Sequence, residues 1–100
     1  MPTHFRKLLV VICEAALEKS VVDDAHGMGA AGYTIAEVRG GARGGVREGA
    51  WEADRSIEVK VICEAAVAEQ LAEHLLSTYD KHYAITLYLS DVAVLRPEKF

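Results

Sequence analysis

The sequence predicts an α+β sandwich, a four-stranded antiparallel sheet with two helices on one face. The main observation is a repeat: Val-Ile-Cys-Glu-Ala-Ala occurs at positions 11–16 and again at 61–66 of the 100 residues. Each copy starts as an apolar, β-branched run and continues into Ala-rich sequence with apolar residues at helical spacing. The second observation is the length, because a chain this short forms a single domain, here residues 1–100, around one core.

The first repeat predicts a strand, a helix and a second strand. The first strand, Phe5 to Cys13, is apolar on both faces, so both faces need cover. The helix runs from about Glu14 to His26 and leaves through the Gly-rich segment Gly27 to Gly32, where a left-handed residue can end it. The second strand is Tyr33 to Arg39. The apolar stripe of the helix consists of Leu17, Val21, Ala25 and Met28.

A long glycine-rich loop, about Gly40 to Asp54, separates the second strand from the third. Its first ten residues contain five glycines, at positions 40, 41, 44, 45 and 49. We expect this loop to be flexible unless a ligand orders it.

The second repeat again predicts a strand, a helix and a strand. The third strand, Arg55 to Cys63, alternates between apolar and polar residues, as a half-buried strand does. The helix spans about Glu64 to Asp80, and the fourth strand runs from about Tyr83 to Leu95 and is stopped by Pro97. The stripe of this helix consists of Val67, Ala68, Leu71, Ala72, Leu75 and Leu76.

This βαββαβ order is that of the ferredoxin-like sandwich. Its first and third strands are central, adjacent and antiparallel, so Cys13 and Cys63 lie at opposite ends of the sheet, on the order of 20 Å apart. That separation excludes a disulfide, and both cysteines are expected to be buried core residues. Because the first and fourth strands carry apolar residues on both faces, the uncovered face predicts an oligomer.

Composition and residue spacing argue against several classes of function. The net charge of -4 argues against nucleic-acid binding. No segment approaches the roughly 20 apolar residues of a membrane span, and the start does not have the pattern of a signal peptide, so we expect no membrane insertion and a cytoplasmic location. The four histidines and two cysteines have no metal-ligand spacing. A metal site built across subunits stays open as an alternative.

The loop carries the strongest binding signal. Arg39, Arg43 and Arg47 recur at intervals of four among glycines, and forked guanidinium donors with exposed backbone N–H groups suit phosphate or another oxyanion. A solvated hairpin without a ligand is the alternative. Trp51, the only tryptophan, is either an aromatic anchor for a partner or a contact on the domain's own surface.

Three motifs in order resemble the PII signalling family, most closely its PII-like branch of SbtB and carboxysome-associated PII proteins. They are Gly32-Tyr33-Thr34, the loop sequence from Val38 to Gly45, and the ending from Asp91 to Arg96. The resemblance implies a homotrimer that packs its sheets together and binds adenine nucleotides in clefts between subunits.

The resemblance also implies site residues. Gly32, Tyr33 and Thr34 would line the base of the cleft. A glycine and arginine set in the loop would approach the phosphates, the start of the fourth strand would flank the nucleotide, and a C-terminal arginine would bind phosphate. These further residues are Gly40, Gly41, Arg43, Arg47, Tyr83, Ala84 and Arg96, and the partner-binding loop would use Arg43, Arg47 and Trp51.

Departures from the family pattern change the expected ligands. Gly44 and Gly45 stand where nitrogen-regulating members have Gln and Lys, so 2-oxoglutarate sensing by that route is not expected. Val94 stands where those members have a further C-terminal arginine, which favours ADP and AMP over ATP. Cyclic AMP is a further candidate, and bicarbonate is a candidate ligand near the loop arginines.

The resulting hypothesis is a non-enzymatic sensor in which nucleotide binding orders the loop. Its partner, by resemblance, is a bicarbonate transporter or a carboxysome component. One alternative is an acylphosphatase-like hydrolase, which would need a phosphate cradle directly after the first strand, where the chain has Cys13-Glu14-Ala15-Ala16. The other alternative is a trimeric metal-handling protein of the CutA type.

Overall fold

A computed structural model of the chain describes residues 2–42, 45–47 and 55–100. The strands are β1 (His4–Glu14), β2 (Thr34–Val38), β3 (Gly40–Ala42), β4 (Gly45–Arg47), β5 (Ser56–Cys63) and β6 (Ile85–Val94). The helices are α1 (Glu18–Gly27) and α2 (Ala65–Tyr79), and two short 3₁₀ turns are η1 (Ala15–Leu17) and η3 (Pro97–Lys99).

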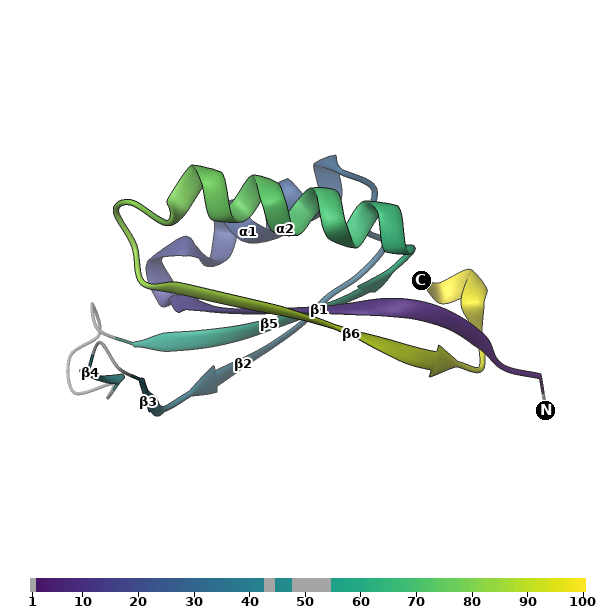
Figure 1. The fold of residues 1–100 in the computed structure, drawn as a ribbon, viewed down its shortest axis with the longest axis horizontal. Coiled ribbons are helices and arrows are strands. Elements are labelled where there is room, and N and C mark those ends of the chain that lie inside the picture. The colour runs from purple at the N-terminus through teal and green to yellow at the C-terminus, as the bar shows by residue number, and fades with distance from the viewer. Residues whose placement is uncertain (1, 43–44, 48–54) are drawn as a thin grey trace.

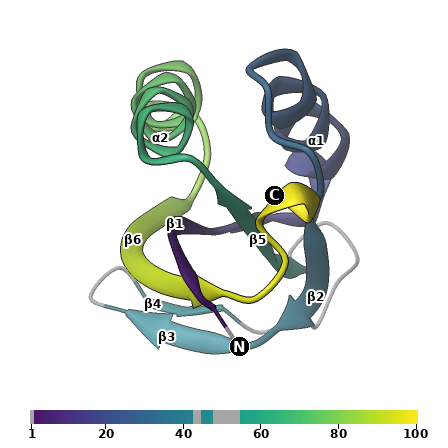
Figure 2. The ribbon, with the colours of Figure 1, turned by 90° about the vertical axis from the view of Figure 1, so that its right-hand side faces the viewer.

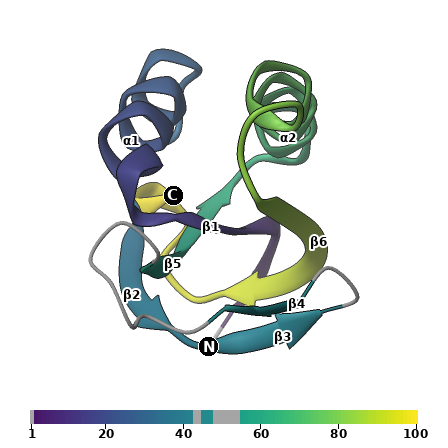
Figure 3. The same ribbon diagram turned by 90° about the vertical axis from the view of Figure 1, so that its left-hand side faces the viewer.

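The predicted fold class is confirmed. Four strands form an antiparallel sheet in the order β2-β5-β1-β6, with β1 and β5 in the centre as expected. Figure 1 shows α1 and α2 together above one face of this sheet, and Figures 2 and 3 show the two helices side by side with the opposite face free of helices.

The strand register holds the two cysteines far apart. In the β1–β5 ladder Cys13 pairs with Ile57, whereas Cys63 pairs with Lys7. Six residues along a strand correspond to about 20 Å, which agrees with the separation expected from the repeat. Both cysteines are free and buried.

The core lies between the sheet and the two helices. β1 and β5 contribute alternate residues, as the period of a strand requires. The α2 stripe is buried at three of its expected positions, but Leu76 is 47% exposed, so its assignment to the core is wrong. The fully enclosed side chains include Leu9, Val11, Val21, Ile57, Val59, Val61, Leu71 and Leu75.

The first helix begins later than predicted. Glu14 keeps an extended backbone, with φ -66° and ψ 142°, and the chain then forms the 3₁₀ turn η1 before the α-helix begins at Glu18. The backbone N–H of Ala15 donates to the carbonyl of Arg55, 2.8 Å away. This hydrogen bond holds η1 beside Arg55, the residue before β5, and the α-helix begins only after η1.

The start of the predicted loop is a hairpin. β3 and β4 form a separate two-stranded sheet in which Gly40 pairs with Arg47 and Ala42 with Gly45. The rest of the predicted loop, 43–44 and 48–54, lies outside the described residues, and Arg43 and Trp51 with it.

The sheet face opposite the helices carries apolar side chains, as predicted from the two-sided strands. Val10 points to this face yet is only 1% exposed, and Figure 2 shows β6 curling around β1 on this side. At the α2–β6 edge, Leu76, Tyr88 and Leu89 are exposed and line a groove of about 340 Å³.

Neither helix in the described part of the chain is long and apolar enough to cross a membrane.

Candidate functional site

A pocket of about 390 Å³ opens on the helix-free side of the sheet. Residues from β1, β5, the entry to β2 and the C-terminal turn η3 meet in it, although they are distant in sequence. Three of the predicted site residues are among its lining residues, which are Leu8, Gly32, Tyr33, Thr34, Lys60, Ile62, Lys99 and Phe100.

The end of α1 directs the chain to this pocket. Gly29 has φ 101°, the left-handed conformation that glycine adopts without penalty. The N–H of Ala30 donates to the carbonyl of Ala25 at 3.0 Å, and the N–H of Gly29 donates to that of His26 at 3.2 Å. These two bonds form a Schellman motif, with Ala30 buried beneath it. The sequence expectation of a left-handed exit is therefore confirmed at Gly29.

Local contacts then fix the three predicted residues. The ring of Tyr33 packs edge-on against the ring of His26, with centroids 5.9 Å apart and an angle of 85°. Thr34 begins β2 and pairs with Lys60 of β5. A Cβ placed on Gly32 would meet no atom within 4 Å, so the space above this glycine is open.

The chemistry of the pocket is mixed. Leu8 and Ile62 provide apolar surface, Tyr33 and Phe100 provide aromatic rings, and Lys60 contributes an ammonium group, as Lys99 does. None of the described residues that line it has a carboxylate side chain. Aromatic rings stack on flat heterocycles, and ammonium groups bind phosphate oxygens. A flat ring bearing an anionic group fits this combination.

The C-terminal turn brings Lys99 to the pocket. Arg96 precedes η3, and its Nε lies 3.3 Å from Oε1 of Glu98. It does not line the pocket, whereas Lys99 does. The turn is held by backbone bonds from Lys99 to Arg96 and from Phe100 to Pro97, each 3.0 Å.

Another group of predicted residues lies at the far end of the sheet. Tyr83 and Ala84 connect α2 to β6; the N–H of Tyr83 donates to the carbonyl of Tyr79 at 3.0 Å, and the rings of these two tyrosines lie 6.1 Å apart. The N–H of Ala84 donates to Oε2 of Glu14 at 2.8 Å. Figure 1 shows the α2–β6 connection and β3, which contains Gly40 and Gly41, at the same end.

The predicted residues of the described chain that border β2 and β6 therefore form two separated groups. Thr34 pairs with Lys60, whereas Val38 pairs with Ser56, four residues or about 13 Å further along the strands. Gly40 follows Val38 at this second position. Arg47 ends β4 opposite Gly40, and Arg43 and Trp51 belong to the undescribed residues.

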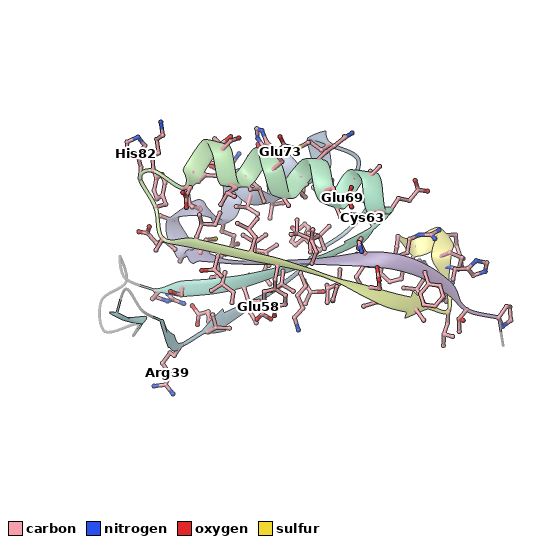
Figure 4. The ribbon with its side chains drawn as sticks, in the orientation of Figure 1. Arg39, Glu58, Cys63, Glu69, Glu73 and His82 are labelled. Carbon is pink, nitrogen blue, oxygen red and sulfur yellow. The ribbon has the colours of Figure 1, made fainter. Side chains whose placement is uncertain are left out.

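A second pocket, of about 260 Å³, lies where β2 leads into β3. Its lining residues are Glu37, Val38, Arg39, Arg55 and Ser56. Arg55 forms an ion pair with Glu37, whereas Arg39 is exposed and points away from the sheet in Figure 4. A cation thus stands at the base of the hairpin, where the sequence predicts anion binding.

Other polar clusters serve the fold. Asp24 of α1 accepts a hydrogen bond from the Tyr79 hydroxyl at 2.8 Å, and Nε2 of His74 lies 3.3 Å from the same oxygen. Burial is the larger cause, and this hydrogen bond the second, of a raised pKa of Tyr79.

Burial also raises the pKa of the Cys13 thiol to about 11 and raises the pKa of Cys63, so neither is a thiolate nucleophile at neutral pH. Within residues 2–42, 45–47 and 55–100 no three His, Cys, Asp or Glu side chains group as a metal site.

Sequence reasoning missed several pocket residues. Lys60 was recognisable as an outward residue of an alternating strand, and Lys99 as part of a short basic ending. No spacing rule joins positions 8, 60 and 99, because only the sheet register and the path of η3 bring them together.

Comparisons with known proteins give the family. The model of the nitrogen regulatory protein P-II matches residues 6–99. No curated protein matches the chain. A solved structure of a protein from Thermus thermophilus, described as PII-like and signalling, is 34% identical, with a TM-score of 0.86 over 100% of this chain and 99% of that one.

Two solved structures of CPII from Thiomonas intermedia K12, a nitrogen regulatory PII-like protein, are also similar. The complex with ADP, AMP and bicarbonate is 26% identical, with a TM-score of 0.88 and coverage of 99% of this chain and 96% of that one. The complex with ADP and bicarbonate is 25% identical, with a TM-score of 0.86 and coverage of 99% and 97%. With its family model, its fold and these relatives in agreement, the chain belongs to the P-II family.

Proposed function

We propose that this protein is a PII-like regulator that binds ADP and AMP in clefts between the subunits of a homotrimer. ATP and cyclic AMP are further candidate ligands. The observation that carries the proposal is the separation of the predicted residues: Gly32, Tyr33 and Thr34 line one pocket, whereas Gly40 and Ala84 lie at the other end of the sheet. Two subunits placed side by side would complete one cleft from both groups.

The similar CPII structures support the ligand class, because they contain ADP, AMP and bicarbonate. The pocket of this chain offers what such ligands need, aromatic surface from Tyr33 and Phe100 and cations from Lys60 and Lys99. Bicarbonate would bind nearer the hairpin, where Arg39 is exposed.

The proposed role is signalling and not catalysis. Nucleotide binding would order the segment around the hairpin, and Arg43, Arg47 and Trp51 would then present or withdraw a surface for a partner. The partner would be a bicarbonate transporter or a carboxysome component in the cytoplasm. Because Trp51 is the only tryptophan, its fluorescence reports this ordering directly.

Calorimetry with ADP, AMP, ATP and cyclic AMP tests the proposal. We expect heat of binding with ADP and AMP, and the proposal is rejected if none of the four nucleotides produces any. Gly32→Leu should block the pocket, since the space above Gly32 is open and the added side chain would occupy it. Gly27→Leu is the matched control, because a Cβ there also meets no atom within 4 Å, yet Gly27 does not line the pocket.

A further inference from the structure

We propose that Glu58 and Lys60 exchange ion-pair partners between copies of this chain, and that this charge pair selects the register in which helix-free faces pack together. The inference rests on the homotrimer of the proposed function and names the residues that decide how two subunits fit. It does not depend on a bound nucleotide.

The charge pair lies at the centre of the helix-free face. β5 is a central strand that pairs with both β1 and β2. Side chains alternate along a strand, and Ile57, Val59 and Val61 belong to the core under the helices, so Glu58 and Lys60 point to the opposite face. Figure 4 shows Glu58 on the side of the sheet away from the helices.

The neighbours of the pair on this face are mostly apolar. Lys60 pairs with Val10 of β1, and Glu58 pairs with Ile12. Val10 is paired with Tyr88 on its other side and is only 1% exposed, whereas Tyr88 is 50% exposed. A subunit packed on this face would remove water from both charges, which is favourable only when each charge gains hydrogen-bonding partners.

Within one chain the two charges satisfy each other incompletely. Nζ of Lys60 lies 3.3 Å from Oε1 of Glu58, which is longer than the roughly 2.7–2.9 Å of a good charge-assisted hydrogen bond. The ammonium group has three donors and the carboxylate about four acceptor sites. The side chains remain 50% and 21% exposed, respectively. Most of their bonding capacity is therefore left for groups from outside the chain.

Another copy of the chain is the occupant that complements this pair. The charges of Glu58 and Lys60 cancel, so the centre of the face favours neither an acidic nor a basic partner. A copy related by cyclic symmetry presents the same two charges, and the ammonium of one subunit can then meet the carboxylate of the next. A shifted register would place like charges together or leave one unpaired, and either is costly inside an interface.

Charge reversal tests the role of the pair in assembly. Glu58→Lys and Lys60→Glu should each raise the protein concentration of half-assembly at least about tenfold, because like charges then meet in a buried interface. The double variant Glu58→Lys/Lys60→Glu should restore most of the assembly. Gel filtration with light scattering, without nucleotide, measures these changes. Lys19→Glu and Asp23→Lys are the matched controls, since that ion pair of 2.8 Å lies exposed on α1, and both should assemble like the unmodified protein.

Mixing the two charge-reversal variants distinguishes exchange between subunits from a contact within one chain. We expect an equimolar mixture of Glu58→Lys and Lys60→Glu to form oligomers that contain both chains, at a concentration where each variant alone is monomeric. Native mass spectrometry identifies them. If circular dichroism shows that a reversal unfolds the chain, Glu58→Gln and Lys60→Met take its place and should each weaken assembly, whereas Lys60→Arg should assemble normally.

The outcomes separate this inference from nucleotide binding. Restored assembly in the double variant without mixed oligomers would confine the pair to one chain and overturn the inference, as would normal assembly of both single variants. A monomeric unmodified protein would overturn both the inference and the homotrimer. If the expected pattern is found and no nucleotide gives heat, the charge pair stands and the nucleotide proposal fails.

Discussion

The carboxylate of Glu14 accepts a 2.8 Å hydrogen bond from the backbone N–H of Ala84. This bond joins the last residue of β1 to the residue that precedes β6. It also places a negative charge beside Tyr83 and Ala84, which the proposed function assigns to the nucleotide cleft. A bound phosphate would have to approach this carboxylate or displace it from the amide.

Replacing Glu14 should therefore lower the stability of the fold and raise the affinity for ADP. In Glu14→Ala we expect a loss of about 1 kcal/mol in the free energy of unfolding, because a hydrogen bond is lost. We expect ADP affinity to rise a few-fold, since the repulsion between charges at such a site amounts to about 0.2–1 kcal/mol. Urea denaturation and calorimetry measure the two effects. Glu14→Gln keeps the acceptor and loses the charge, so it should raise affinity with less loss of stability; weaker ADP binding in both variants would contradict this role.

The exposed apolar face should hold the trimer together. Tyr88 is 50% exposed on β6 and pairs with Val10, which points to the helix-free side. Introducing a charge in Tyr88→Asp should dissociate a trimer into monomers at micromolar concentration, measured by gel filtration with light scattering. Lys19→Glu on α1 should leave the trimer intact. A monomer before any mutation would remove the basis of this prediction.

Arg47 is predicted to act on the outer phosphates. Arg47→Ala should weaken ATP and ADP more than AMP, because each further phosphate adds charge near the hairpin that this arginine would neutralise. Calorimetry across the series measures the gradient. An equal loss for adenosine would contradict a phosphate role and indicate damage to the fold.

The bond between Tyr79 and Asp24 should contribute to stability alone. Tyr79→Phe removes the hydroxyl that lies 2.8 Å from Asp24 and keeps the ring that packs against Tyr83. We expect about 1 kcal/mol less stability and unchanged ADP affinity. Ser77→Ala, which removes an exposed bond to the carbonyl of His74, is the control and should cost less. Equal stability of Tyr79→Phe and the unmodified protein would show that the bond is not formed in solution.

Stability should fall at alkaline pH because of the buried thiols. Burial raises the pKa of Cys13 from an ordinary value of 9.0 to about 11, so the folded chain retains a proton that the unfolded chain releases. The free energy of unfolding should therefore be insensitive to this group below about pH 9 and decrease between about pH 9 and 11. Urea denaturation at three pH values in this range measures the slope. Cys13→Ala should show a shallower slope, and an unchanged slope would exclude Cys13 as its origin.

The repeat was sufficient to predict the sheet order and most of the core. The alternation of apolar and polar residues in β5 and the apolar stripe of α1 both follow from which side chains are buried. Both patterns are local and can therefore be read directly from the sequence. Leu76 does not belong to the core because it lies at the α2–β6 edge, where it lines an open groove with residues of β6 and stays 47% exposed. The sequence predicts a fourth strand that starts at about Tyr83, whereas β6 starts at Ile85. The backbone N–H groups of Tyr83 and Ala84 donate to Tyr79 and Glu14 and not to a neighbouring strand.

The site was harder to predict than the fold. Gly32, Tyr33 and Thr34 line the pocket, and they form a contiguous motif that is visible in the sequence alone. Lys60 and Lys99 were not found, since their proximity depends on η3 returning to the sheet near the start of β2. A pairing of this kind has no local signal in the sequence.

The division of the predicted cleft between two ends of one subunit has a thermodynamic consequence. A ligand that must touch two chains at once binds the assembled form in preference to the separated chains, so ligand occupancy and assembly are linked. Dilution should therefore weaken nucleotide binding, and saturating nucleotide should hold the subunits together at concentrations where they would otherwise come apart. On this basis the abundance of the protein itself would help to set the nucleotide level to which it responds.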